Sequence, residues 1–387
     1  MEGAPGDEEL RRYASALSEH SDSRQAAISV AEEALQQVGP SPALAVVFVT
    51  PPHRDDVGEV ADVIRAVLRP QTLLGATAVA VLGGRREVEQ EPGVSLFAAR
   101  LGSPARPIRL DAESVDEGWV ITGVPDDLAG LRSMLLLADP FTFPVDILLR
   151  QLRRDHPGLA VVGGMASAAM RAGENRLLLD DSAYRDGAVA VLLAEDVSPQ
   201  AVVSQGCRPI GRPYIVTRAD GQMIYELGGK PALERLLTTL GHLSPADNRL
   251  AEQGLHCGIV IDERKEEFER GDFLIRGVLG ADRESGAVAV GDVVSVGATL
   301  QFQVRDAASA DEDLRELLAG RAGRGALVFT CNGRGQRLFR TPDHDATVVS
   351  DLLGTSTVAG MFCAGELGPV GGRNALHGFT ASLAIFQ

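Results

Sequence analysis

The feature of this sequence that most constrains the fold is an internal repeat. A shift of 88 residues lays Val46–Pro52 on Met134–Pro140, and the same shift lays Leu73–Ala78 on Val161–Ala166 without a gap. Each copy combines an apolar strand, an amphipathic helix, a glycine-containing strand and a later strand. A repeated β-α-β-β unit must cover the apolar face of its sheet, which favours helices layered on sheets.

The elements of the copies can be placed by their apolar patterns. The first copy predicts strands at 43–50, 72–82 and 93–101 and a helix at 55–68. The second predicts strands at 134–138, 159–167 and 187–193 and a helix near 144–154. A weaker third copy predicts strands at 325–331, 358–364 and 378–386 and a helix at 343–353. The glycine-broken runs of 273–304 predict an antiparallel meander.

These patterns predict an α/β to α+β fold, with helices layered on mixed sheets in two domains. The length of 387 residues also exceeds what one ordinary core holds. Residues 8–38 predict one or two helices, capped near Ser21-Asp22-Ser23. We therefore expect a helical lead at 1–40, an N-terminal domain at 41–210 and a C-terminal domain at 211–387.

Charge and cysteine usage exclude several classes of protein. The net charge is −16, and the basic residues are interspersed with Asp and Glu, which argues against binding nucleic acid or an anionic membrane. The first nine residues are acidic, unlike a signal peptide, and no apolar run approaches the ~20 residues of a membrane-spanning helix. The four cysteines form no C-x-x-C pair, so we expect a cytoplasmic protein without a disulfide framework or zinc site.

The densest motif lies in the C-terminal part. It comprises the turn Cys331-Asn332-Gly333-Arg334-Gly335, the run GMFCAGELGPVGGRN at 360–374, and HGFTAS at 377–382. Together with SQGCRPIG at 204–211 and GKPAL at 229–233, it resembles the FIST family, in which a FIST N-terminal domain precedes a FIST C domain. The resemblance covers roughly residues 40–387.

This resemblance implies a sensory module of signal-transduction proteins that binds small ligands, amino acids among them. FIST C domains also occur in F-box-type ubiquitin ligase subunits, where they would contact protein partners. The sequence contains no recognisable kinase, cyclase, receiver, DNA-binding or F-box segment. We therefore expect any signal to pass to a separate, unknown signalling partner or through self-association.

Two interpretations of the glycine-rich run remain open. The glycines at 365, 368, 371 and 372 fit either a loop whose amides approach an anionic ligand or a tight strand connection. Glycines at 75, 163 and 360 fall in equivalent strands of the three copies, where they leave room for close packing or for a ligand. No nucleotide-binding glycine motif occurs.

Cys331 and Cys363 are expected on neighbouring strands. They are either inert buried thiols or, next to Arg334, Arg373 or His377, reactive ones. Glu366 with Arg373, Asn374 and His377 suits an amino acid, because the carboxylate binds an ammonium and the guanidinium a carboxylate. The alternative is that Glu366 and Arg373 only pin the loop by an ion pair.

The predicted function is a non-catalytic small-ligand sensor. The predicted ligand-binding residues are Cys331, Asn332, Arg334, Cys363, Glu366, Arg373, Asn374 and His377. The sequence has no H-E-x-x-H or G-x-S-x-G motif, and we expect no metal and no cofactor. The alternatives are a cysteine-dependent enzyme that uses Cys363 or Cys331, and a protein-interaction scaffold.

Overall fold

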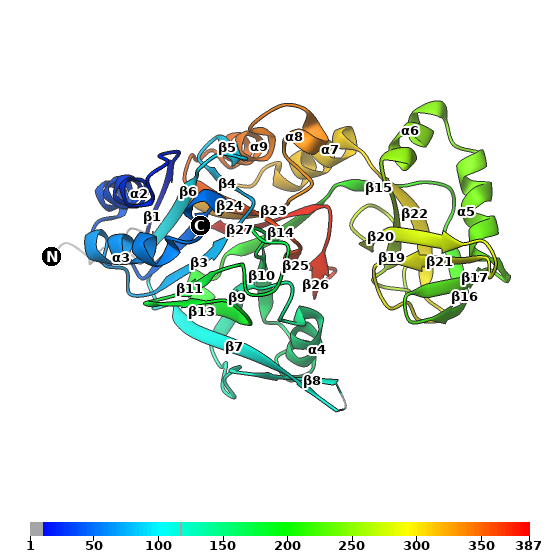
Figure 1. Ribbon diagram of the computed structural model, residues 1–387, viewed down its shortest axis with the longest axis horizontal. Coiled ribbons are helices and arrows are strands. Elements are labelled where there is room, and N and C mark those ends of the chain that lie inside the picture. The colour runs from blue at the N-terminus through cyan, green and yellow to red at the C-terminus, as the bar shows by residue number, and fades with distance from the viewer. Residues whose placement is uncertain (1–10, 117) are drawn as a thin grey trace. The chain divides into compact units, whose positions relative to one another are not determined.

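The computed structural model describes residues 11–116 and 118–387 (Figure 1), which form two compact units. Unit 1 contains the described residues up to Val203, Arg315–Leu376 and Thr380–Gln387; unit 2 contains Ser204–Leu314 and His377–Phe379. This division differs from the boundary expected at 210. The third copy of the repeat returns to unit 1, because its strands pair with strands of the other two copies.

The three copies contain the β-α-β-β elements that the repeat predicted, and they share one topology. In each, the first strand lies in the middle, parallel to the second strand and antiparallel to the last. The first copy consists of β2 (Leu44–Val49), α3 (Val57–Val67), β3 (Leu73–Thr77) and β6 (Val94–Arg100). The second consists of β9 (Leu131–Ala138), α4 (Val145–Asp155), β10 (Ala160–Met165) and β13 (Ala188–Ala194). The third consists of β23 (Gly325–Cys331), α9 (His344–Leu353), β24 (Val358–Cys363) and β27 (Thr380–Phe386).

Each copy also contributes a hairpin to the sheet of another copy. The hairpins are β4 (Ala80–Gly83) with β5 (Arg86–Glu89), β11 (Leu177–Leu179) with β12 (Ser182–Tyr184), and β25 (Glu366–Val370) with β26 (Arg373–His377). Strand β4 pairs with β24, β11 with β3, and β25 with β10. The first copy thus gives its hairpin to the third, the second to the first, and the third to the second. Each of these three sheets therefore contains strands from two copies.

This exchange corrects the single strand predicted at 72–82. That segment breaks after Thr77, because β3 belongs to the sheet of its own copy and β4 belongs to the sheet of the third copy. An apolar run that crosses from one buried sheet to another keeps its hydrophobic pattern on both sides of the break. Hydrophobicity alone therefore does not reveal the change of sheet.

The lead segment is only partly helical. A strand, β1 (Arg12–Ser18), pairs along its whole length with β6, where a helix was expected. Its side chains alternate between two core clusters, with Tyr13 and Leu17 on one side and Ala14 and Ala16 on the other. The helix α2 (Ser23–Val38) follows, and the predicted cap is confirmed: Asp22 accepts a hydrogen bond from the amide of Gln25 at 2.8 Å. Residues 1–10 of the lead lie outside the described residues.

The glycines of the three second strands are explained by close packing. A Cβ at Gly75, Gly163 or Gly360 would lie 2.6, 1.9 or 2.0 Å from a carbonyl oxygen of the neighbouring first strand. Real Cβ atoms do not approach backbone that closely. These glycines therefore bring the parallel strand pairs together and do not open space for a ligand.

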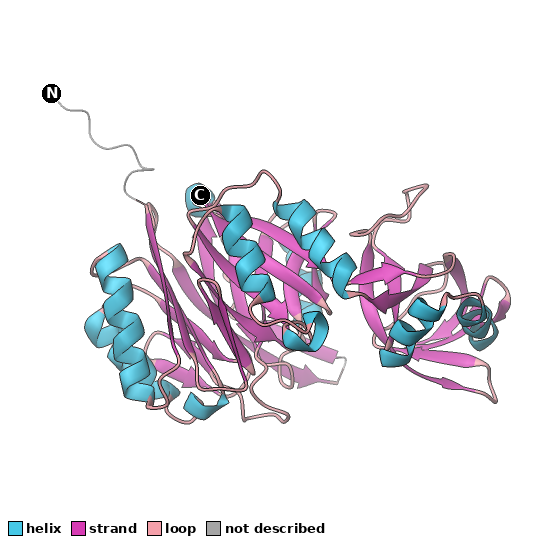
Figure 2. Cartoon of the chain, turned by 90° about the horizontal axis from the view of Figure 1, so that it is seen from above, coloured by secondary structure: helices cyan, strands magenta, loops and turns pink. Residues whose placement is uncertain are grey.

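The core of unit 1 lies between its sheets and beneath its helices. One cluster joins all three copies through Phe48, Leu137 and Phe329, which are at most 1% exposed. Helices α2 and α3 lie over one face of the first sheet (Figures 1 and 2), where most of their alanines and valines are buried. Helix α4 buries its leucines against the second sheet.

Outer strands complete the sheets. Strands β7 (Arg106–Val115) and β8 (Gly118–Thr122) lie beside β13, and β14 (Gln200–Gln205) lies beside β27.

Unit 2 is a closed antiparallel ring of strands. Its order is β22 (Thr299–Arg305), β16 (Tyr214–Asp220), β17 (Met223–Leu227), β21 (Ala287–Val290), β20 (Phe273–Asp282) and β19 (Leu255–Val260), which pairs again with β22. Short β15 (Cys207–Pro209) and β18 (Lys230–Pro231) and helices α5 (Ala232–Gly241) and α6 (Pro245–Gln253) complete it. The strands predicted at 273–304 are present and antiparallel, but they do not form a meander: β20 pairs with β21, whereas β22 pairs with β16 and β19. Across the described residues of both units, no helix combines the length and apolar character needed to cross a membrane.

Candidate functional site

The two predicted cysteines lie side by side at the carboxyl ends of β23 and β24, where Cys331 and Cys363 are register partners. Cys363 is fully buried, and burial raises the pKa of its thiol well above the usual value, with Glu366 and Cys331 acting in the same direction. A Cβ on Gly164 of β10 would lie 2.3 Å from its sulfur. The close packing and the raised pKa both favour a packing role for Cys363 over a reactive thiol.

The turn after β23 folds back onto the strand end. The amide of Arg334 donates to the carbonyl of Cys331 at 2.8 Å, and the amide of Gly333 donates to the Cys331 sulfur at 3.4 Å. The amide of Asn332 donates to the carbonyl of Cys363 at 2.9 Å, which ties the turn to β24. These bonds direct the Arg334 side chain inward.

Arg334 is fully buried and forms a bidentate ion pair with Asp345 of α9. Its Nε and Nη2 atoms lie 2.7 and 2.8 Å from the two carboxylate oxygens of Asp345. Thr330 and His344 also bind this carboxylate, at 2.7 and 3.0 Å. Burial alone would raise the pKa of Asp345, but the Arg334 charge outweighs it and holds that pKa far below its usual range. The third nitrogen of Arg334, Nη1, has no hydrogen-bond partner among the described residues.

Glu366, the first residue of β25, is the second fully buried ionisable group of this cluster. Its Oε2 accepts hydrogen bonds from the backbone amide and the hydroxyl of Thr380, at 3.1 and 2.8 Å. Its Oε1 accepts none from residues that the structure describes. Burial raises the pKa of Glu366 to about 8, although Thr380, Arg334 and Cys331 lower it. Near pH 7 the carboxyl is therefore mostly protonated.

The remaining predicted residues lie elsewhere. Asn374 accepts from the amide of Val161 at 2.9 Å and donates to the carbonyl of Leu159 at 2.7 Å, so it fastens β26 to the start of β10. Arg373 is exposed at the amino end of β26, and His377 belongs to unit 2. Within unit 1 the structure thus brings together Cys331, Asn332, Arg334, Cys363 and Glu366.

The glycine-rich run is not an anion-binding loop. Residues 366–370 form strand β25, and Gly371 and Gly372, both with positive φ, make the turn to β26. Gly368 has no room for a side chain, because a Cβ would lie 2.3 Å from a methyl group of Val203. Of the two interpretations, the tight strand connection is correct.

Sequence reasoning missed Glu87, which the exchanged hairpin brings to the start of α9. Its Oε1 accepts from the amide of Ala346 at 3.0 Å, and its Oε2 has no partner among the described residues. Burial, with Asp345 nearby, raises its pKa to about 8. Asp343, which directly precedes α9, accepts a hydrogen bond from the amide of Glu87 at 2.7 Å and makes no side-chain bond to the helix. Glu87 and the start of α9 are brought together only by the pairing of β4 with β24, which the sequence does not indicate.

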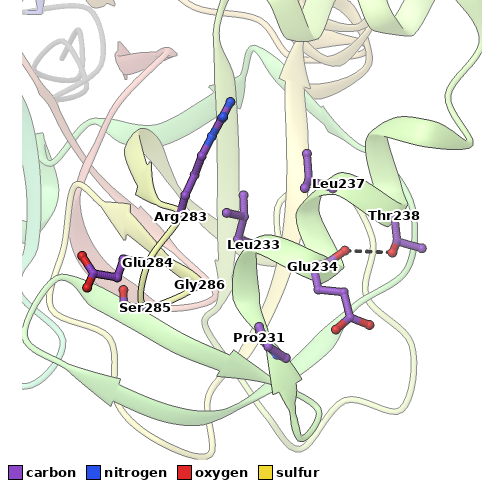
Figure 3. Close-up of a pocket in the computed structure, with 9 residues that line it drawn as sticks. All are labelled: Pro231, Leu233, Glu234, Leu237, Thr238, Arg283, Glu284, Ser285 and Gly286. Atoms are coloured by element: carbon purple, nitrogen blue, oxygen red, sulfur yellow. Dashed lines mark hydrogen bonds between the residues drawn. The ribbon is translucent and has the colours of Figure 1, made fainter.

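Unit 2 has an open groove (Figure 3), and two residues of the GKPAL motif, Pro231 and Leu233, lie in its lining. The groove has a volume of about 670 Å³ and lies between α5 and the turn that joins β20 to β21. Its lining includes Leu233, Leu237, Arg283 and Glu284, and Leu237 is 59% exposed. It contains none of the predicted site residues. In the described parts of both units, no group of three or more His, Cys, Asp or Glu side chains is placed to hold a metal ion.

Comparisons with known proteins agree with the C-terminal motif. Residues 43–230 match the model of the FIST N domain, and residues 232–369 match that of the FIST C domain. An uncharacterized protein of Mycobacterium bovis is 47% identical over 373 residues, covering 94% of this chain and 96% of its own. An uncharacterized protein of Mycobacterium tuberculosis is 47% identical over 374 residues, covering 94% and 97%. The chain therefore belongs to the FIST family and carries a FIST N domain followed by a FIST C domain.

Proposed function

We propose that this protein senses a small, amino-acid-like ligand, which binds at the strand ends beside Cys331, Arg334 and Glu366. FIST domains are associated with sensing in signal transduction. The proposed output goes to a separate signalling protein. The proposed compartment is the reducing cytoplasm, because the four cysteines are buried and none is in a disulfide.

The observation that carries this proposal is a pair of unfilled hydrogen-bonding atoms. Arg334 Nη1 is a donor and Glu366 Oε1 an acceptor, both on side chains with no exposed surface, and neither has a partner within the described residues. Leaving such a buried group unsatisfied costs roughly 1–3 kcal/mol, and more when the group is charged. A ligand that fills both positions recovers this cost.

An amino acid has the matching chemistry. Its carboxylate would accept a charge-assisted hydrogen bond from the guanidinium, and its ammonium would donate to the carboxylate of Glu366. Since Glu366 has a pKa of about 8, it must lose its proton to bind an ammonium. Binding is therefore coupled to proton release, and affinity should fall about tenfold for each pH unit below 8.

Cysteine-dependent chemistry is the alternative, and only Cys331 is suited to it. The amide of Gly333 donates to its sulfur at 3.4 Å, and its thiolate would lie close to the Arg334 charge. Both features favour a thiolate. Fast, selective labelling of Cys331 by iodoacetamide in the folded protein would support the enzyme, whereas slow labelling of all four thiols would argue against it.

The sensing proposal is tested by thermal-shift measurements with the proteinogenic amino acids and small carboxylates at pH 7 and 8.5. We expect at least one amino acid to raise Tm; a ligand at 100 times its Kd stabilises by about 2.7 kcal/mol. Glu366→Gln should keep the fold and lose the shift. The matched control, Glu316→Gln on an exposed position of the helix Ala307–Leu318, should keep it. The proposal fails if no compound shifts Tm at either pH.

A further inference from the structure

The hairpin of β7 and β8 ends a seven-stranded sheet of unit 1 (Figure 1). Strand β8 is the last strand of this sheet, and within the part of the chain that the structure describes its outer edge pairs with no other strand. In a β-ladder, alternate residues direct their amide and carbonyl groups toward one neighbour, so the other residues of β8 direct theirs to the open edge. The edge can therefore accept a further strand.

Apolar side chains of the hairpin are exposed beside this edge. Val115, Trp119 and Val120 are 46%, 43% and 47% exposed. Natural edge strands commonly carry charged residues or proline, which discourage pairing with another chain. The sequence of β8, GWVIT, has neither. An uncharged edge without proline is suited to pairing with an extended segment.

The two faces of the hairpin differ in charge. Trp119 and Ile121 lie on the face toward α4, because Ile121 is buried in the core cluster that contains the leucines of this helix. Asp111 and Glu113 of β7 are cross-strand partners of the alternate residues of β8, so they lie on the opposite face. The acidic side chains of β7 therefore do not face α4.

A groove of about 500 Å³ lies between β8 and α4. Trp119 and Ile121 line it from the strand, and Ile147, Arg150 and Arg154 line it from the helix. The spacing of the three helix residues places them on one face of α4. The groove thus combines apolar side chains with two positive charges.

The two arginines of the groove differ in their partners. Nε and Nη2 of Arg154 donate to the carboxylate of Asp155 at 2.7 and 2.9 Å. Arg150 is exposed and forms no ion pair with any residue that the structure describes. In a chain with a net charge of −16, Arg150 is a local positive charge that a carboxylate of a partner can approach.

We propose that β8 and α4 together bind an extended acidic segment of another protein, which adds to the sheet as a strand beside β8. An apolar side chain of the segment packs on Trp119, and a carboxylate two positions along, on the same face, reaches Arg150. A second copy of this chain fits less well, because its β8 carries no carboxylate for Arg150. This inference goes beyond ligand sensing and does not depend on the site beside Glu366.

The test uses the full chain and a blocked heptapeptide in which threonines alternate with glutamate, valine and glutamate. Trp119 is the only tryptophan of the sequence, so its fluorescence reports on the groove. We expect the peptide to shift the emission to shorter wavelength in a saturable titration, because the bound strand removes water from the indole ring. The same peptide with lysine in place of glutamate should give no shift. Glu366→Gln should leave the titration unchanged, which separates this proposal from the ligand site.

Charge reversal at Arg150 tests the proposed ion pair. Arg150→Glu should weaken binding of the glutamate peptide by about tenfold or more, since a like-charge contact replaces an attractive one, and should allow the lysine peptide to bind. The matched control is Arg65→Glu, the same change at an exposed position of α3, which should alter neither titration. If Arg150→Glu does not fold, the contrast between the two peptides with the unaltered chain still decides.

Strand addition is tested by N-methylation of the peptide at alternate amides. A strand beside β8 directs every second amide toward it, so methylation of one alternate set should abolish the emission shift and methylation of the other should not. No shift with the glutamate peptide, equal effects of the two methylated sets, or equal responses to the glutamate and lysine peptides would overturn the proposal. An emission that shifts with protein concentration alone would assign the edge to a second copy and would also overturn it.

Discussion

Two buried carboxyl groups of unit 1 differ in how they use their oxygens. Asp139, which follows β9, uses both: Oδ1 accepts from Asn175 at 2.9 Å, and Oδ2 accepts from the amide of Phe141 and the hydroxyl of Thr142 at 3.2 and 2.8 Å. Glu366 accepts from Thr380 at Oε2 and is also hydrogen-bonded by the side chain of Cys331, but its Oε1 has no partner among the described residues. Both side chains are completely buried. Burial thus does not distinguish a structural carboxyl from a candidate binding group, whereas unfilled hydrogen-bonding capacity does.

The largest loss of stability from a substitution is expected at the ion pair of Arg334 with Asp345. Arg334→Met leaves Asp345 buried without its cation, which should lower the free energy of unfolding by about 3–5 kcal/mol. Urea denaturation measures this change. The double variant Arg334→Met/Asp345→Leu should recover most of the loss, because no unpaired charge is left. A double variant less stable than Arg334→Met alone would contradict this account of the pair.

Two isosteric substitutions, Asp139→Asn and Glu366→Gln, test whether the two carboxyl groups differ in their structural role. Asp139→Asn replaces one acceptor oxygen by an NH₂ group that faces groups donating to it, so it should cost about 2–3 kcal/mol. Glu366→Gln keeps an oxygen for Thr380 and places its NH₂ where no partner was present, so at pH 6 it should cost less than about 1 kcal/mol. Equal losses in urea denaturation would show that the two carboxyls play the same structural role.

A graded effect, smaller for each pH unit than the loss expected at Arg334, is expected from pH. Glu366 and Glu87 have folded-state pKa values of about 8, above the value of 4.5 for an ordinary glutamate. Between these values the folded state holds protons that the unfolded state has released, so stability should fall as pH rises from about 5 to 8, by up to ~1.4 kcal/mol per unit for each group. Glu366→Gln should flatten this slope in urea denaturation measured at several pH values. A stability that rises over this range would contradict the raised pKa values.

The smallest effect is expected for the labelling of Cys363 in the folded protein. Cys363 should react with iodoacetamide only when the protein unfolds, because burial raises the pKa of its thiol and Gly164 packs directly on its sulfur. Labelling followed by mass spectrometry, with and without urea, measures this. Rapid modification of Cys363 in the folded protein would show that the strand ends open, and it would add Cys363 to Cys331 as a candidate nucleophile.

The sequence was sufficient for the architecture of each copy but not for the connections between copies. Strand and helix periods are local, so the β-α-β-β units could be recognised from the residues alone. The hairpin exchange pairs β4 with β24 across more than 270 residues and leaves no period in the sequence. Glu87 was missed for this reason. Residues 12–18 were read as helix because a short alternation of small residues gives little evidence for a strand until β6 is beside it.

The candidate site was predicted in part for a similar reason. Cys331, Arg334 and Cys363 were placed correctly near Glu366, because parallel strands β23 and β24 end at the same edge of their sheet. Asn374 is close to Glu366 in sequence, but its side chain fastens β26 to β10. The ion pair of Arg334 with Asp345 could not be foreseen, since it depends on how α9 packs.

The most direct test of the sensing proposal is calorimetry of the amino acid that gives the largest thermal shift. Titrations at pH 7 in buffers of different ionisation enthalpy give the number of protons released. The account predicts release of close to one proton, because a carboxyl with a pKa of about 8 is mostly protonated at pH 7 and must ionise to bind an ammonium. It also predicts that Glu366→Gln abolishes the binding. Binding without proton release, or unchanged binding in Glu366→Gln, would contradict it.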